Sequence, residues 1–210
     1  MRFRRITGGE PCRAYAMDSR NGVTLLSVIG GHAIAAVQSV LGRIDEVSST
    51  LSQRRQTVRL IETGKSIPMH TPDHVMINAV LQSGAPLSLQ LRGGLPRGTR
   101  LMWEIIGTEG DLRITAANDQ VPVINIGPLR VEGGRKGEEG YRELEVPQSY
   151  YFGREIAITA RNVVGIYKKM ADELRHGVPI TPNFDHAVVI HKVVDAIERA
   201  DQTAGRVRVG

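Results

Sequence analysis

One histidine of this sequence stands where a helix is expected to begin. His32 follows Gly30 and Gly31, and the apolar side chains of residues 32–41 then recur at helical spacing until Gly42, a typical helix-ending residue. The positive end of the helix dipole favours a neutral imidazole, which could accept or relay the proton of a substrate hydroxyl. His32 is therefore the candidate catalytic residue. The alternative is a histidine that only caps or packs at the helix start.

Two further features could hold a ligand. Arg92, Arg97 and Arg100 surround a turn of glycine and proline, residues 93–96, and together could bind a phosphate or a carboxylate. The alternative is that these arginines bind no ligand and only keep the exposed end of a hairpin soluble. Trp103 lies in the middle of an expected strand, where it either packs or offers its ring to a sugar. We therefore take Arg97 and Trp103 as candidate substrate-binding residues.

The start of the last expected helix carries Asp185, His186 and His191. The two histidines are five positions apart and do not share a helix face, which disfavours a metal site. Asp185 is a third candidate substrate-binding residue, although an acid in the first helical turn also complements the helix dipole. His191 is expected to face the sheet as an interior residue.

The composition disfavours several classes of protein. With 210 residues, of which 41% are apolar and 23% charged, the chain is expected to fold as one globular domain over residues 1–210. The net charge of +5 is scattered in short clusters, which disfavours nucleic acid as a partner. The one cysteine, Cys12, is consistent with a cytoplasmic location. No membrane segment or signal peptide is expected, because no apolar stretch approaches the roughly 20 residues that span a bilayer.

The order of the expected elements indicates an α+β fold. A short apolar run at 22–29 suggests a buried strand, and alternating residues from 74 to 92 predict a hairpin that turns at Ser83–Gly84. Further strands are expected at 99–106, 112–114, 121–126 and 129–131, a mobile loop at 133–141, and helices at 32–41, 155–175 and 183–203. Because strands and helices do not alternate, we predict an open, mostly antiparallel sheet with helices covering one face.

The other face of that sheet is expected to meet a partner. Met76, Val80, Met102 and Ile106 alternate with the main apolar set and therefore lie opposite to it, with few charges between them. A contiguous apolar patch of this kind is unusual on a monomer. We therefore predict a homo-oligomer, most simply a dimer joined through this sheet face.

Three segments together carry a family resemblance. They are NGVTLLSVIGGHAI from residue 21, WEIIGTEGDLRIT from residue 103 and PNFDHAVVIHKVVDAIERADQTAGRV from residue 182. In this order and spacing they resemble the C-terminal domain of the Gfo/Idh/MocA oxidoreductase family, in the branch that includes the yeast galactose-regulon repressor. The resemblance covers about residues 15–209, and it implies an open sheet similar to the C-terminal domain of dihydrodipicolinate reductase.

The resemblance implies half of an enzyme. Family members bind NAD or NADP through an N-terminal Rossmann domain, which also holds a Glu-Lys-Pro motif; this sequence contains neither that motif nor a G-x-G-x-x-G turn after a strand. Residues 1–20 would then be a remnant of the junction between the domains. The chain would be the substrate-binding and dimerisation half of an NAD(P)-dependent sugar or polyol oxidoreductase. Alone it would bind no cofactor, and its partners would be a sugar-like molecule and a Rossmann domain.

A regulatory function is the alternative that the resemblance also implies. The family pairs its histidine with a carboxylate, but Ser27 stands where many members have aspartate, and Ala35 stands where members often have another. A non-catalytic, protein-binding domain of the galactose-repressor type would be consistent with both replacements. A Rossmann domain encoded immediately upstream would favour the enzyme instead.

Overall fold

The structure is a computed structural model that describes residues 11–60, 63–93, 100–118, 123–151, 156–157 and 160–210. Contacts divide the chain into two compact units. The larger unit contains residues 3–95 and 183–210, and the smaller unit contains residues 1–2 and 96–182. Each unit has its own antiparallel sheet of four strands. The single domain over residues 1–210 stays a prediction.

The sheet of the larger unit has the strand order β10-β1-β4-β5. Its strands are β1 (Ile44–Ser52), β4 (His74–Leu81), β5 (Pro86–Arg92) and β10 (Val207–Arg208), and every pairing between them is antiparallel. β4 and β5 form the hairpin expected from the alternating sequence. Gly84 has the positive φ of 86° that the turn between them requires.

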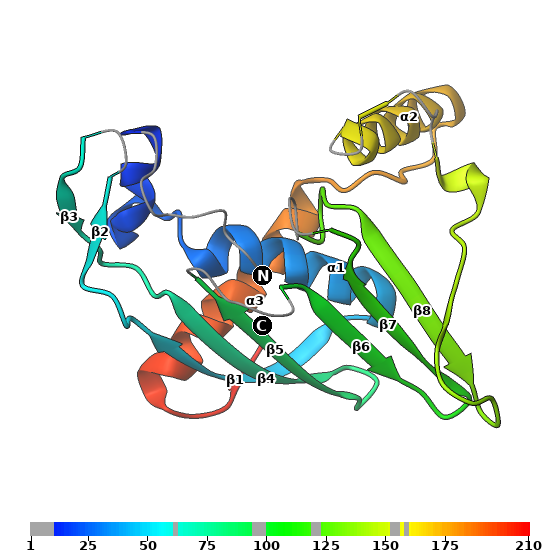
Figure 1. The fold of residues 1–210 in the computed structure, drawn as a ribbon, viewed down its shortest axis with the longest axis horizontal. Helices are drawn as coiled ribbons and strands as arrows, with labels where there is room; N and C mark the ends of the chain where they lie inside the picture. Colours follow the sequence, from blue (N-terminus) through cyan, green and yellow to red (C-terminus); the bar gives the residue numbers. More distant parts are fainter. Residues whose placement is uncertain (1–10, 61–62, 94–99, 119–122, 152–155, 158–159) are drawn as a thin grey trace. The chain divides into compact units, whose positions relative to one another are not determined.

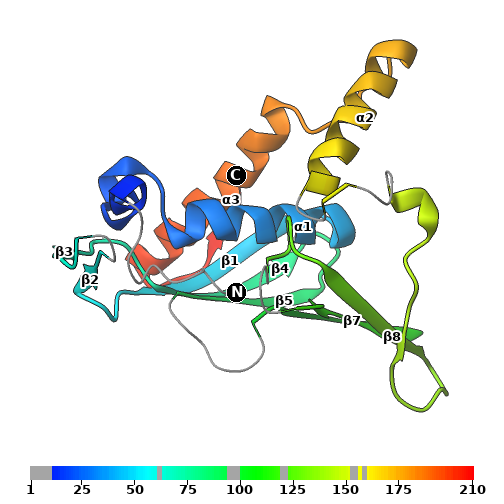
Figure 2. The same ribbon diagram turned by 45° about the horizontal axis from the view of Figure 1, so that its top comes forward.

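Two helices cover one face of this sheet (Figure 1, Figure 2). They are α1 (Gly31–Leu41) and α3 (Phe184–Thr203), which also contact each other. β4 buries every second side chain from Val75 to Leu81 against this layer, as the alternating sequence predicts. The largest fully buried side chains of the unit are those of Leu26, Ile34, Val47, Val75, Leu91, Val193 and Ile197.

Two hydrogen bonds attach α3 to β1 across long separations in sequence. Ser49 Oγ donates to the carbonyl oxygen of Ile197 at 2.6 Å, 148 residues away. The Leu51 N–H donates to Asp201 Oδ1 at 2.8 Å, 150 residues away. β10 then pairs with the free edge of β1 after the chain leaves the helix. The C-terminal segment is therefore an integral part of the larger unit.

The apolar run at 22–29 is helical from Leu25 onward and contains no strand, so the strand predicted there is wrong. Leu25–Gly30 forms a π-helix that continues into α1, and the 3-10 segments Pro11–Met17 and Ser19–Asn21 precede it. A short apolar run does not distinguish a buried strand from a buried helix, because both hide most of their side chains.

The helical run Ser19–Leu41 is long and apolar enough to cross a membrane, so the expectation that no such stretch exists is wrong. This property rests on length and composition alone. In the structure Leu26, Ile34 and Val37 of the run are almost fully buried, and the π-helix contacts β4, β5 and α3. The core helix of a folded domain shares the same composition.

A small hairpin stands beside the main sheet. Its strands are β2 (Thr57–Arg59) and β3 (Ser66–Pro68). Val58 of this hairpin packs with Met17 and Met69 in a separate buried cluster. The cluster fixes the first 3-10 segment against the hairpin.

The smaller unit has the strand order β6-β7-β8-β9. Its elements are β6 (Met102–Ile106), β7 (Gly110–Ala116), β8 (Leu129–Arg135), β9 (Arg142–Glu143), the 3-10 turn η4 (Gln148–Tyr150) and α2 (Arg161–His176). The strand expected at 121–126 is wrong over residues 123–126, where the Gly127 N–H closes a turn onto the Val123 carbonyl at 2.8 Å. Residues 121–122 lie outside the described residues.

The mobile loop expected at 133–141 is also wrong at its start, because residues 133–135 complete β8. Gly134 allows the following turn to approach closely: a Cβ there would lie 2.5 Å from the carbonyl oxygen of Gly140. Gly133 and Gly134, which suggested a loop in the sequence, are therefore needed for close packing between neighbouring chain segments.

The apolar side chains that recur at helical spacing along α2 are exposed; they are Val163, Tyr167, Met170 and Leu174. Among them Tyr167 is 66% exposed and Leu174 is 85% exposed. Beyond the end of the helix at Gly177, the Thr181 hydroxyl and backbone N–H donate to the carboxylate of Glu173. These hydrogen bonds, with one from the Ile180 N–H, lower the pKa of Glu173 and hold the chain after α2 against the helix.

The four apolar residues expected to form one sheet face lie on two sheets. Met76 and Val80 are in β4 of the larger unit, whereas Met102 and Ile106 are in β6 of the smaller unit. On β6 the side chain between the two is Glu104, which pairs with an arginine of β7 at 2.9 Å. The expected continuous apolar face is therefore wrong. Alternation shows which residues share a strand face, but it does not show where a sheet ends.

We predict that Asp201→Ala lowers the free energy of unfolding by about 1–3 kcal/mol, because the Leu51 N–H loses its acceptor. Asp195→Ala is the matched control on the same helix, since Asp195 pairs with Arg199 at the exposed surface, where ion pairs contribute little. Urea denaturation measures both variants. Equal losses would contradict a role for Asp201 in attaching α3.

Candidate functional site

The structure places His32 as expected, in the first turn of α1. The helix start lies directly against the sheet: a Cβ at Gly30 would lie 3.0 Å from Leu26 Cδ1 and 3.1 Å from Leu91 Cδ1. The His32 side chain itself is exposed, and it makes no hydrogen bond or ion pair with another described residue. Its ring is therefore accessible to a ligand on a helix whose other face is fixed in the core.

A capping box at the start of the π-helix engages Ser27. Ser27 N–H donates to Thr24 Oγ1 at 3.0 Å, and Thr24 N–H donates to Ser27 Oγ at 2.8 Å. The Ser27 hydroxyl also donates to the Gly22 carbonyl at 2.8 Å. A carboxylate at position 27 could accept the hydrogen bond from the Thr24 N–H, but it could not donate one to the Gly22 carbonyl. The residue that stands in place of the expected aspartate therefore stabilises the helix start.

The other predicted site residues are distributed over both units. Asp185 is exposed in the first turn of α3, where the neighbouring Asn183 side chain caps the helix by accepting from the His186 N–H at 3.0 Å. Asp185 and His32 lie in the same unit without a hydrogen bond or ion pair between them. Trp103 lies in β6 of the smaller unit. Arg97 lies outside the described residues.

Trp103 is half-buried in a row of apolar side chains across its sheet. It pairs with Ile114 of β7, which pairs in turn with Val131 of β8. Its indole Nε1 is buried and finds no hydrogen-bond partner among the described residues. This environment places Trp103 among packing residues, and a ring platform for a sugar stays a prediction.

His191 is exposed, so its predicted interior position is wrong. The buried stripe of α3 contains Ile190, Val193, Val194 and Ile197, and His191 lies beside this stripe. Among the described residues no group of three or more His, Cys, Asp or Glu side chains is placed to hold a metal ion.

The glycine pairs at 30–31 and 133–134 differ from the turns that bind a dinucleotide. Phosphates of NAD or NADP bind where a strand turns through glycines into a helix N-terminus. Gly30 and Gly31 follow a π-helix rather than a strand, and Gly133 and Gly134 lie inside β8. Neither glycine pair forms the required turn.

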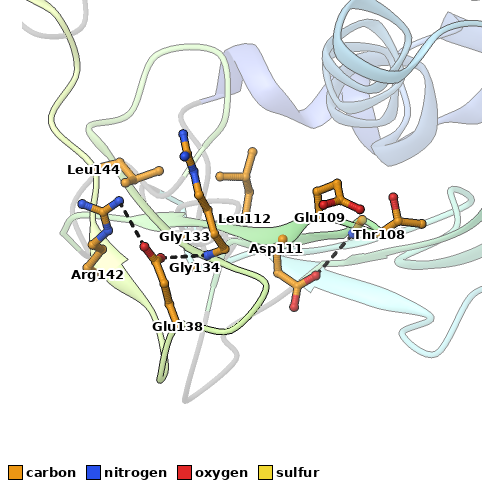
Figure 3. A pocket seen from close by; sticks show the side chains of 12 residues that line it. Thr108, Glu109, Asp111, Leu112, Gly133, Gly134, Glu138, Arg142 and Leu144 are labelled. Atoms are coloured by element: carbon orange, nitrogen blue, oxygen red, sulfur yellow. Dashed lines mark hydrogen bonds and ion pairs between the residues drawn. The ribbon is translucent and has the colours of Figure 1, made fainter.

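A groove of about 500 Å³ lies at the end of the smaller sheet, between the β6–β7 turn and the start of β9 (Figure 3). Two of its three acidic side chains, those of Asp111 and Glu138, have partners among the described residues. Asp111 Oδ1 accepts the Gly107 N–H at 3.2 Å, and Glu138 lies 3.8 Å from Arg142. Sequence reasoning missed this groove, because only the strand register brings the two glycine-rich turns to the same end of the sheet.

Comparison with known proteins identifies related chains of about twice this length. A family model described as Gal80p, C-terminal domain, matches residues 7–116. The Kluyveromyces lactis galactose/lactose metabolism regulatory protein GAL80 is 23% identical over 249 residues, covering 90% of this chain and 54% of its own. The crystal structure of the transcriptional regulator Gal80p from the same yeast has a TM-score of 0.74 at 24% identity, covering 99% of this chain and 49% of its own.

Two oxidoreductase structures have the same fold. An NAD-binding oxidoreductase from Klebsiella pneumoniae has a TM-score of 0.72 at 19% identity, covering 93% of this chain and 54% of its own. Levoglucosan dehydrogenase in complex with NADH has a TM-score of 0.72 at 18% identity, covering 93% of this chain and 53% of its own. These likenesses confirm the predicted α+β fold with open antiparallel sheets. The chain spans about half the length of each of these relatives.

We predict that Ser27→Ala lowers the free energy of unfolding by about 1 kcal/mol, because the Thr24 N–H and the Gly22 carbonyl both lose their partner. Ser39→Ala is the matched control, since the Ser39 hydroxyl only donates to the Ala35 carbonyl one turn earlier in α1. Thermal denaturation followed by circular dichroism measures both. A loss at Ser39 as large as that at Ser27 would exclude a special role for the capping box.

Proposed function

Since the chain belongs to the family of the Gal80p C-terminal domain, we propose that it is the substrate-binding half of an NAD(P)-dependent sugar or polyol oxidoreductase. The observation that supports this most directly is the exposed His32, held at the start of a helix whose opposite face is buried. An NAD-binding oxidoreductase and a levoglucosan dehydrogenase share the fold of this half.

In this proposal His32 accepts the proton of a substrate hydroxyl. An imidazole nitrogen can take that proton as the alcohol is oxidised, provided that the hydroxyl lies within hydrogen-bond distance. Neither glycine pair forms a dinucleotide-binding turn, so NAD or NADP would be held by a separate Rossmann domain, which we propose as the partner of this half. The substrate would be a sugar-like molecule presented between them.

A regulatory function is the second candidate, and one observation favours it. The Ser27 hydroxyl is committed to the capping box, and no carboxylate among the described residues forms a hydrogen bond or ion pair with His32. A proton relay that needs an acidic partner beside the histidine is therefore incomplete here. The relative from Kluyveromyces lactis is named as a regulatory protein of galactose and lactose metabolism.

We predict that His32→Ala lowers kcat for sugar-alcohol oxidation about a hundredfold to ten-thousandfold, with little change in KM, when this chain is assembled with an NAD(P)-binding domain. His186→Ala, on the exposed start of α3, is the matched control. Nicotinamide absorbance measures turnover, and calorimetry with NADH is expected to show no binding to the chain alone. Unchanged turnover in His32→Ala would exclude the proposed catalytic residue. A stable assembly without turnover would favour the regulatory function.

We also propose that the chain forms a homodimer through the exposed face of the β1-β4-β5 sheet. Around Met76 this face carries the neutral side chains of Thr50 and Gln90, which pair with it across the sheet, while its charged residues Glu46, Arg208 and Arg92 lie further along the strands. The exposed face of the smaller sheet instead carries charged side chains, including Glu104 and Arg130. Interface cores are depleted of charged residues, so the larger sheet is the better candidate.

We predict that Met76→Glu converts the dimer to a monomer, because the new carboxylate would be buried without a partner in the interface. Met102→Glu is the matched control, since Met102 is similarly exposed but lies on the charged smaller sheet. Light scattering at tens of micromolar protein measures the mass of each. A monomeric parent chain, or a mass that falls only in Met102→Glu, would exclude this interface.

A further inference from the structure

A cavity of about 240 Å³ lies inside the larger unit, and His32 does not line it. Segments from distant parts of the sequence form its wall: the first 3-10 segment, the start of the π-helix, the β2 region and the chain just before β4. The wall is mostly apolar and includes Met17, Val28, Val58 and Met69. Three of these four side chains are buried, so the cavity adjoins a formed core.

Thr71 and Asp73 are the buried polar residues among those that the structure describes, and both line this cavity. Asp73 is only 7% exposed. Its Oδ1 accepts the backbone N–H of Arg54 at 2.9 Å, and no cationic side chain of the described residues pairs with its carboxylate. Buried carboxylates are normally paired or bonded to a cation, because desolvating an unpaired charge is costly.

We propose that this cavity binds a small organic ammonium compound. The charged nitrogen donates to the carboxylate of Asp73, and the hydrocarbon part lies against Met17, Val58 and Met69. The arrangement follows the usual division of a ligand pocket, in which apolar walls supply contact and a few polar groups fix orientation. A cationic ligand supplies the charge partner that Asp73 lacks among the described side chains.

Two features of the wall narrow the ligand class. A monosaccharide has several hydroxyls, and each hydroxyl buried against an apolar wall without a partner weakens binding by about tenfold or more. Thr71 Oγ1 already donates to the Ala16 carbonyl at 3.4 Å, so its hydrogen is not available to such hydroxyls. Arg55 also lines the cavity, but it is exposed, so water and salt screen its repulsion of a cation.

The methionines of the chain provide the test. Met17 and Met69 line the cavity, whereas Met76, Met102 and Met170 do not. With methyl-labelled methionine, titration with isoamylamine is expected to shift the NMR signals of Met17 and Met69 saturably and to leave the other three unchanged. Isoamyl alcohol has nearly the same shape without the charge, and it is expected to bind at least about tenfold more weakly. D-Galactose is expected to leave Met17 and Met69 unchanged.

Two variants connect the binding to this cavity. Asp73→Asn keeps an oxygen that can accept the Arg54 N–H but removes the charge, and it is expected to weaken isoamylamine binding at least about tenfold. Val28→Phe narrows the cavity from a partly exposed position and is expected to weaken binding as well, whereas Val40→Phe on the same helical run, outside the cavity, is not.

Several results would overturn the proposal. They are equal binding of isoamyl alcohol and isoamylamine, unchanged affinity in Asp73→Asn, or shifts at Met76 and Met102 as large as those at Met17 and Met69. If Asp73→Asn does not fold, unchanged affinity in Val28→Phe has the same consequence. Binding of D-galactose at Met17 and Met69 without binding of the amine would replace the ammonium class with a sugar. The test is independent of the activity proposed for His32.

Discussion

The larger unit depends on the return of α3 to a sheet that the chain left at the end of β5. Residues 96–182 belong to the other unit, so the bonded residues of α3 and β1 are 148 and 150 positions apart in the sequence. The entropic cost of closing a loop grows only slowly with the length of the loop. A modest set of contacts can therefore offset this cost even for so long a loop. Here the contacts are specific: two hydrogen bonds from Ser49 and Leu51 reach α3, and Val193 and Ile197 fill the space between the helix and the sheet.

His32 has a defined position because this packing also fixes α1. Ile34 and Val37 are buried on the helix face toward the core, and Gly30 brings the helix start into close contact with Leu91 of β5. A helix anchored on one side presents the opposite side in a single orientation. The position of the accessible imidazole is therefore determined by apolar contacts of neighbouring helical residues rather than by hydrogen bonds of the imidazole itself.

Sequence patterns predicted the parts of the structure that depend on neighbouring residues. The alternation from 74 to 92 gave the β4–β5 hairpin, because one face of that hairpin is buried and the other is not. The position of His32 followed from the two glycines and the helical spacing after them. The π-helix at Leu25–Gly30 and the division into two sheets were not predictable in this way, because both depend on which segments pack together. Asp73 was missed for the same reason, since its buried environment is built by chain segments far apart in sequence.

Ser27 is one of the two positions, with Ala35, on which the proposed choice between catalysis and regulation rests. A serine hydroxyl can both accept and donate, and at Ser27 it does both within the backbone of residues 22–24. A carboxylate there would have been a charged acceptor able to support a histidine in proton transfer. The hydroxyl instead gives the π-helix a stable start. The same residue that stabilises this fold thus removes the group on which a paired acid–base mechanism would rely, and His32 must act without it if it acts at all.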